Sequence, residues 1–333
     1  MTASSSPDDL HRLIQEVISR LGYKTNAAAI ARGVRRLNYG LPAEDEFSVI
    51  CAWLGKCRLV HKLDQQQAPL TSRSEYQVPD LLAAFDGSGT FLIEVKACND
   101  QTLSMKSDYY RRLRAYGELL DRPLLVAWKF YNLWTLVDVA CLKLAKTNFN
   151  ISHAEAMQQN LLGVLAGDVA YTLMPDAGVH FDLEKEELVA REATGDGWNE
   201  KWQMRIADAF LTDGSNQRRR DFHPETQQLL TTWPLKERAV HSETGILKSF
   251  VAGDGQVQFA HGALVRLLAW EGRDQQKPHW RGLLQAPQVT RSIASFSAAL
   301  QRRLDEGVVR HIFHQHPTDR SVFLQSQCSA AAK

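Results

Sequence analysis

Residues 77–97 read QVPDLLAAFDGSGTFLIEVKA, and this stretch decides the fold that we predict. Two apolar runs flank the polar loop Asp-Gly-Ser-Gly at residues 86–89, a composition typical of a β-hairpin turn. Asp80 stands at the head of the first run, and Glu94 and Lys96 stand at the end of the second. Formation of the hairpin would therefore bring two carboxylates and an amine into one neighbourhood.

Strand alternation decides which of these side chains share a face. Successive side chains of a strand point to opposite faces, so Leu92, Glu94 and Lys96 lie on one face, and we expect the two polar groups to look outward from an apolar backing. Asp80 joins them only if the pairing register sets it across from Glu94 or Lys96. That register requires a three- or five-residue loop, or a bulge, instead of a plain four-residue turn.

Length, charge and cysteine content set the broad class. A chain of 333 residues exceeds the usual size of one hydrophobic core, so two or three domains are expected. The formal net charge of +1 neither supports nor excludes a nucleic-acid partner. No stretch has the pattern of a signal peptide or a membrane span, which favours a cytoplasmic protein without a membrane partner. The five cysteines form no CxxC pair and are expected to be reduced packing residues.

A predicted helix from Pro42 to Gly55 precedes the hairpin and carries Glu44, Asp45 and Glu46 in its first turn. Acids in a first turn complement the helix dipole. The alternative is that Glu44 or Glu46 reaches the same site as Asp80. Both interpretations stay open at this point.

The elements around the hairpin follow an α/β order. A strand is predicted over 58–63, a helix over 104–120, and strands over 123–130 and 133–140. Helix, three strands, helix and two strands predict a mixed-sheet α/β core over residues 42–146. An N-terminal helical segment, residues 1–41, comes before it.

The second half of the chain divides into two predicted regions. Residues 147–255 read as an α+β region without a motif that indicates a role. Residues 256–326 place helices over 259–270 and 289–306 before two β-prone runs, 308–314 and 320–324. This layout is typical of a winged-helix-like α+β module that binds DNA or mediates assembly.

Asp80, Glu94 and the backbone carbonyl of Val95 are candidate ligands of a metal ion. Hydrolysis of a phosphodiester requires a metal that neutralises the phosphate and acidifies water. Mg²⁺ and Mn²⁺ prefer this kind of oxygen donor, together with several waters. Lys96 would position the attacking water or stabilise charge on the phosphate.

Pro79-Asp80, thirteen further residues and then Glu94-Val95-Lys96 resemble the PD-(D/E)XK motif of the restriction-endonuclease-like nucleases. The following helix and strand look similar to the Holliday-junction-resolvase-like branch of that superfamily. The resemblance spans residues 42–140. It implies metal-dependent DNA cleavage with Asp80, Glu94 and Lys96 as catalytic residues, Mg²⁺ as the cofactor and Mn²⁺ able to substitute. The family's acid on the preceding helix corresponds best to Glu44, with Glu46 as the near alternative.

The resemblance and the layout together indicate an endonuclease. The helix after the motif carries no clear glutamine motif of the exonuclease branch. A nuclease core beside a separate reader module suits restriction or anti-phage and anti-plasmid defence. The alternatives are a DNA repair or junction-resolving nuclease and a catalytically idle DNA-binding or complex-forming subunit. DNA is the expected partner, RNA stays open, and double-strand cleavage would suit a homodimer or a larger defence complex.

Basic side chains on two predicted helices are candidate contacts to nucleic acid, although charged residues on a helix are more often a solvated face. The candidates on the helix after the motif are Lys106, Arg111 and Arg114. Those on the predicted helix 289–306 are Arg302 and Arg303, which we expect to be exposed.

Overall fold

The computed structural model describes residues 43–64, 69–195, 197–271 and 296–319. The predicted N-terminal segment 1–41 and the predicted strand 320–324 lie outside the described residues. The chain forms two compact units. Among the described residues, unit 1 contains 43–168, 268–271 and 314–319, and unit 2 contains 169–267 and 296–313. In the described part of the chain, no helix is both long and apolar enough to cross a bilayer.

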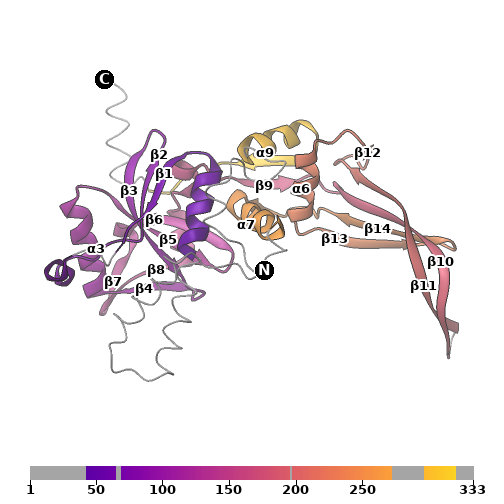
Figure 1. Ribbon diagram of the computed structural model, residues 1–333, viewed down its shortest axis with the longest axis horizontal. Helices are drawn as coiled ribbons and strands as arrows, with labels where there is room; N and C mark the ends of the chain where they lie inside the picture. The colour runs from indigo at the N-terminus through magenta and orange to yellow at the C-terminus, as the bar shows by residue number, and fades with distance from the viewer. Residues whose placement is uncertain (1–42, 65–68, 196, 272–295, 320–333) are drawn as a thin grey trace. The chain divides into compact units, whose positions relative to one another are not determined.

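Unit 1 is built on a five-stranded sheet with the strand order β1-β2-β3-β5-β6 (Figure 1). Its strands are β1 (Cys57–Lys62), β2 (Leu81–Phe85), β3 (Gly89–Ala97), β5 (Leu124–Phe130) and β6 (Leu133–Asp138). The β3–β5 pair is parallel and the other pairs are antiparallel. The predicted mixed sheet is therefore present.

Helices pack on both faces of this sheet. Helix 43–54 lies on one face, where the Phe47 ring is 4.9 Å from the ring of Trp134. Helix α3 (Ser107–Leu119) covers the other face, where its Leu113 is buried in one cluster with Leu92 and Trp128. A sheet covered on both faces requires strands that are apolar almost throughout, as β3 and β5 are.

A smaller sheet with the order β4-β8-β7 completes unit 1. Its strands are β4 (Thr102–Lys106), β7 (Lys143–Ala145) and β8 (Asn148–Ser152). The short helices of unit 1 are η2 (Leu70–Ser74), η3 (Val139–Cys141), α4 (His153–Gln158) and α5 (Leu162–Ala166). The predicted helix over 104–120 therefore begins later, at Ser107, because Leu103 and Met105 alternate with exposed residues as in a strand. The predicted domain boundary at 146 falls in the turn between β7 and β8.

Unit 2 contains a five-stranded sheet, β12-β11-β10-β14-β13, and a three-stranded sheet, β15-β9-β16. Its strands are β9 (Ala170–Leu173), β10 (Gly178–Thr194), β11 (Gly197–Thr212), β12 (Arg218–Arg219), β13 (Lys236–His241), β14 (Gly245–Val251), β15 (Gln258–Phe259) and β16 (Val309–Phe313). Its helices are α6 (Pro224–Thr232), α7 (Ala260–Glu271) and α9 (Phe296–Asp305).

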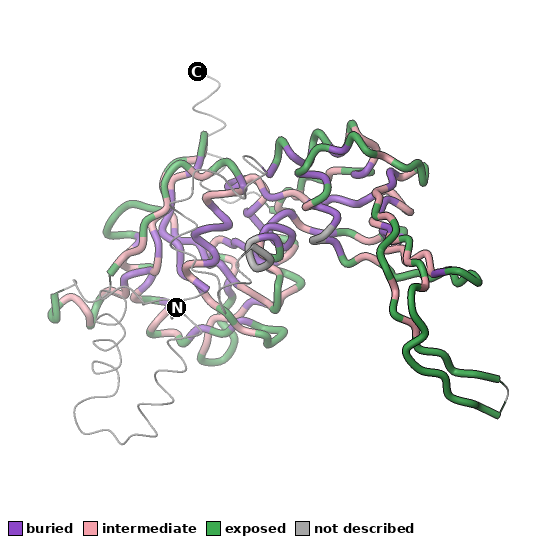
Figure 2. The backbone as a smooth tube through the Cα atoms, turned by 45° about the vertical axis from the view of Figure 1, so that its right-hand side comes forward, coloured by how far each residue is buried: buried purple, intermediate pink, exposed green. Residues whose placement is uncertain are grey.

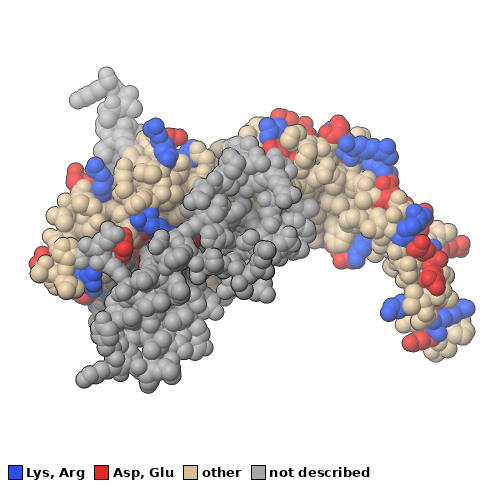
Figure 3. All heavy atoms as spheres, viewed as in Figure 1, with Lys and Arg blue, Asp and Glu red and all other residues tan. Residues whose placement is uncertain are grey.

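Strands β10 and β11 form a long arm that the sequence did not predict. They pair along their whole length, whereas β14 pairs with β10 only up to Glu184. Beyond that point the hairpin is a two-stranded ribbon, and its outer part is exposed on all sides (Figure 2). Figure 3 shows charged side chains of both signs along it. Three register shifts break the strict alternation by which such strands are recognised in a sequence.

Strand β16 does not form the wing hairpin within the described residues. It pairs antiparallel with β9, a strand from the predicted middle region, and β15 pairs with the other edge of β9. Helices α7 and α9 lie within the predicted helical stretches. The predicted division at residue 256 therefore separates strands that share one sheet, because β9 contributes the central strand.

Candidate active site

The hairpin has the register that a site shared by Asp80 and Glu94 requires. Leu81 pairs with Ile93, and Phe85 pairs with Gly89 across a loop of the three residues 86–88. Continued by one residue, this register sets Asp80 across from Glu94. The three-residue loop thus places both carboxylates on the same face of the sheet, as predicted.

Asp80 is anchored at the end of β2. Its Oδ2 accepts a hydrogen bond of 2.7 Å from the backbone N–H of Val95, and its carbonyl accepts one of 2.9 Å from the N–H of Leu63. The N–H and C=O of one strand residue point to the same edge of the strand. The carbonyl of Val95 therefore also points toward the edge on which Asp80 lies.

Glu94 lies beneath α3, so the prediction that it faces outward was wrong. Its residue is fully buried, and its Oε1 accepts hydrogen bonds from Lys96 Nζ and from Tyr109 Oη, the latter of 2.5 Å. Lys96 keeps about a third of its side chain exposed and lies with Nζ 5.0 Å from the Tyr109 ring centroid. Glu94 Oε2 is buried without a hydrogen-bond partner among the described residues.

The pKa values reflect this crowding. Burial raises the pKa of Asp80 well above its ordinary value, and the negative charges of Glu94 and Glu44 raise it further. Burial opposes the charged form of Lys96, but the adjacent Glu94 outweighs it and raises the pKa of the ammonium. Burial and Glu94 also raise the pKa of the Tyr109 phenol. Lys96 and Tyr109 therefore stay protonated and act as donors to Glu94.

The structure separates the two candidate acids of helix 43–54. Glu44 Oε2 lies 3.3 Å from Lys62 Nζ, and its charge contributes to the raised pKa of Asp80. Glu46 lies with its carboxylate bonded to Lys129 Nζ (2.6 Å) and Trp134 Nε1 (2.9 Å) on the opposite face of the sheet. Glu44 is therefore the acid that lies within electrostatic reach of the site.

The donor set suits a hard divalent cation. Within the described ranges, no group of three or more His, Cys, Asp or Glu side chains is arranged to hold a metal ion. Mg²⁺ does not require such a group, because it is commonly held by one or two carboxylates together with carbonyls and waters. Asp80, the Val95 carbonyl and the buried, unpartnered Oε2 of Glu94 fit that description.

The predicted phosphate contacts of unit 1 are exposed. Lys106 is the last residue of β4 and not part of a helix. Arg111 is exposed on α3 and has no ion-pair partner in the part of the chain that the structure describes. Arg114 pairs with Glu118 at 2.9 Å.

The two candidates of unit 2 differ from the prediction. Arg303 is 1% exposed, because it lies on the buried stripe that α9 forms with Phe296 and Leu300 at helical spacing. The expectation that Arg303 is exposed was therefore wrong. Arg302 is half-exposed but its Nε bonds Glu225 Oε2 at 3.0 Å.

Tyr109 is the site residue that the sequence analysis missed as a partner of Glu94. It lies in the run YYRRLRAY, where no local signal separates it from Tyr110 or Tyr116. Only the packing of α3 on β3 shows that its hydroxyl reaches Glu94.

Comparisons with known proteins do not identify a family for this chain. No protein-family model matches the chain, and no curated protein sequence matches it. Among solved structures, the chain is similar to a Holliday junction resolvase of Archaeoglobus fulgidus, an archaeal hyperthermophile, with 20% sequence identity. The match covers 35% of this chain and 85% of the resolvase chain with a TM-score of 0.29. At this TM-score the likeness carries no argument about fold or function.

Proposed function

We propose that unit 1 is a Mg²⁺-dependent nuclease that hydrolyses DNA phosphodiester bonds. The observation that supports this most is the placement of Asp80 across from Glu94, whose Oε2 is buried without a hydrogen-bond partner among the described residues. A buried carboxylate oxygen without a donor is costly. A bound cation would relieve that cost.

In this proposal the residues of the site are either metal ligands or hydrogen-bond donors. Asp80, Glu94 Oε2 and the Val95 carbonyl hold the metal, with Glu44 as the additional acid. A bound Mg²⁺ supplies Lewis-acid polarisation of the phosphate and a more acidic water. Tyr109 and Lys96 donate to Glu94 Oε1, which leaves Oε2 for the cation. The Lys96 ammonium orients water or stabilises charge that develops on the phosphate.

The finer assignments are supported by the sequence resemblance, by the expected reader module, and by the two sites that double-strand cleavage would need. They are endonucleolytic cleavage, a role in restriction or anti-phage defence, and action as a homodimer or within a larger complex. A repair or junction-resolving nuclease is the second candidate. A catalytically idle subunit is disfavoured, because such a subunit could lose Asp80, Glu94 or Lys96 without penalty.

Cleavage by the full chain tests the proposal. Plasmid, linear duplex, single-stranded and branched DNA, and RNA, are each incubated with Mg²⁺, Mn²⁺ or EDTA. We expect metal-dependent cleavage of DNA, and a loss of about 10²–10³-fold in rate for Asp80→Ala and for Lys96→Ala. Asp86→Asn, which changes an exposed hairpin-loop acid paired with Arg58, is the matched control and should cut as wild type does.

Two outcomes would contradict the assignment. One is a wild-type protein that cuts none of these substrates with either metal. The other is a pair of variants, Asp80→Ala and Lys96→Ala, that cut as fast as wild type.

A further inference from the structure

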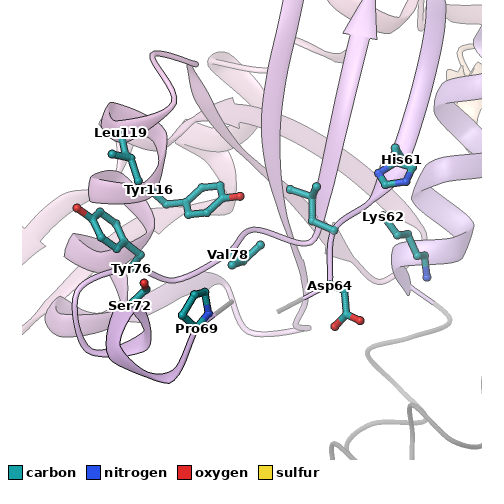
Figure 4. A pocket seen from close by; sticks show the side chains of 10 residues that line it. His61, Lys62, Asp64, Pro69, Ser72, Tyr76, Val78, Tyr116 and Leu119 are labelled. Carbon is teal, nitrogen blue, oxygen red and sulfur yellow. The ribbon is translucent and has the colours of Figure 1, made fainter. Parts of the chain in front are cut away.

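A pocket of about 600 Å³ opens in unit 1 beside the candidate acids (Figure 4). Its wall is formed by residues 61–64 at the end of β1, by Pro69 and Ser72 of the η2 segment, by Tyr76 and Val78 between η2 and β2, and by the last turn of α3. The volume lies within the range of about 300–1,000 Å³ that is typical of small-molecule sites. The pocket is therefore large enough for a flat ring of nucleobase size.

Two connections place this pocket next to the acids. Leu63, which lines it, donates its N–H to the Asp80 carbonyl at 2.9 Å. Tyr116, which lines its other side, follows Tyr109 by seven residues, which is about two helical turns, on the same side of α3. Tyr109 bonds Glu94. The β1–β2 register also pairs His61 with Leu82, which sets His61 on the sheet face of Asp80.

The lining favours a neutral ring over a phosphate. Tyr76 and Tyr116 contribute aromatic rings, and His61, Ser72 and Asp64 contribute hydrogen-bonding groups (Figure 4). The cation in the described lining, Lys62, is already paired with Glu44 at 3.3 Å and with Asp45. Because the charge of Lys62 is already compensated, the pocket offers little attraction to a phosphate.

We propose that this pocket receives an unpaired nucleobase of the strand whose phosphate lies at the Asp80–Glu94 site. This inference rests on the proposed nuclease function and names its substrate class: single-stranded, bulged or branched DNA with an unpaired base beside the cleaved bond. A base reaches such a pocket only after it leaves the stack. Stacking on tyrosine then holds it with little sequence preference, because every base has a π-face.

Photocrosslinking tests the placement without any need for cleavage. Single-stranded oligonucleotides and bulged duplexes that carry one 5-iododeoxyuridine at successive positions are irradiated with full-length Asp80→Asn protein, and crosslinked residues are mapped by mass spectrometry. We expect crosslinks to Tyr76 or Tyr116 from the unpaired base. Crosslinks that map elsewhere, or none at all, would overturn the pocket assignment and leave the nuclease proposal standing.

A matched pair of substitutions on η2 tests the consequence for rate. Ser72→Phe fills the pocket, whereas Ser74→Phe adds the same ring at an exposed position of the same short helix, outside the pocket lining. We expect Ser72→Phe to slow cleavage of bulged or single-stranded DNA about tenfold, the scale of one base-stacking contact. Ser74→Phe should cut at the wild-type rate, and melting temperatures show that both variants fold.

The outcomes separate the two proposals. Equal cleavage rates for Ser72→Phe and Ser74→Phe would overturn the base pocket while the metal-dependent activity stands. A wild-type protein that cuts nothing but crosslinks at Tyr116 would overturn the nuclease proposal and support base binding.

Discussion

The carboxylates of Asp80 and Glu94 differ in the number of hydrogen-bond donors that surround them. Glu94 has two donors, Lys96 and Tyr109, for one of its oxygens. Asp80 has one backbone donor, and burial and two negative neighbours raise its pKa. The charge of Asp80 is therefore a cost to the folded protein in the absence of a cation.

Asp80→Asn should raise the melting temperature at neutral pH in EDTA. A carboxyl whose pKa is raised on folding contributes stability below its unfolded pKa and loses that contribution as pH rises through its folded pKa. Asparagine cannot ionise, so its advantage over wild type should grow as pH rises above 3.8, the ordinary pKa of an aspartate. Each kcal/mol shifts the melting temperature by about 2–4 °C. Melting curves in EDTA from pH 4 to 8 measure this, and a variant less stable than wild type at pH 8 would contradict it.

Mg²⁺ should stabilise wild type and not Asp80→Asn. A ligand that binds only the folded state adds RT ln(1 + [L]/Kd), about 2.7 kcal/mol at a concentration of 100 times Kd. The measurement is a melting-temperature titration with MgCl₂ at constant ionic strength. Equal shifts for both proteins would place the cation elsewhere.

Arg303 and Arg302 are neighbours with opposite expected effects on stability. Burial lowers the pKa of Arg303 to about 10, and none of its guanidinium nitrogens has a hydrogen-bond partner among the residues described. Arg303→Met should be neutral or raise the free energy of unfolding by about 1–4 kcal/mol. Arg302→Met should lower it by about 1–3 kcal/mol, because the buried Glu225 loses its ion pair. Urea denaturation of both variants measures the difference, and a strongly destabilised Arg303→Met would show that the guanidinium is satisfied.

The arm of β10 and β11 is an amphipathic ribbon. Along β11 the side chains of Trp198, Trp202 and Ile206 alternate with polar residues. The Arg191 guanidinium lies 4.4 Å from the Trp198 ring centroid, and Lys185 Nζ lies 5.2 Å from that of Trp202. A two-stranded ribbon is only marginally stable in water. These cross-strand contacts therefore supply much of its local order.

Shortening the arm should leave the rest of unit 2 folded. Replacement of residues 186–203 by Asn-Gly keeps the Lys185–Met204 pair and closes it with a favoured two-residue turn. Since the removed residues are mostly exposed, we expect the melting temperature to change by only about 2–4 °C, the shift for roughly 1 kcal/mol. Calorimetry of the full chain and of the shortened chain compares the two. A larger loss would show that the arm packs against another part of the protein.

The C-terminal part of the chain contributes to both units. Strand β16 belongs to unit 2, whereas residues 314–319 belong to unit 1. There Gln315 Nε2 donates to the Met157 carbonyl at 2.5 Å, and the Thr318 N–H donates to the Gln158 carbonyl at 2.9 Å. Deletion of everything after residue 258 would therefore damage both units. It would not remove a single, separable DNA-binding module.

A chain that ends at Phe313 should have a less stable unit 1 than a chain that ends at Asp319. The shorter chain loses the bonds of Gln315 and Thr318 but keeps β16, and each lost hydrogen bond costs about 0.5–1.5 kcal/mol. Hydrogen exchange of amides in α4 reports on unit 1, and exchange in β9 serves as the control in unit 2. Equal protection of α4 in both chains would contradict this.

The features that were predicted correctly are local in the sequence. Strand alternation sets Glu94 and Lys96 on one face and shows which loop lengths would bring Asp80 to that face, because register follows from loop length and a period of two. The sequence left the loop length open, and the structure has three loop residues after Phe85. The apolar run of β5 likewise identifies an inner strand of the mixed sheet, and that of β6 identifies the strand beside it at the edge.

The features that were missed depend on partners far away in the sequence. Glu94 is buried because Tyr109 of α3 packs over it, and Lys106 ends a strand because β4 pairs with β8. Strand β16 pairs with β9, although most of the sequence of unit 2 lies between these two strands. No short window of sequence encodes such pairings, since burial and long-range hydrogen bonds are set only when separate elements compete for the same surface.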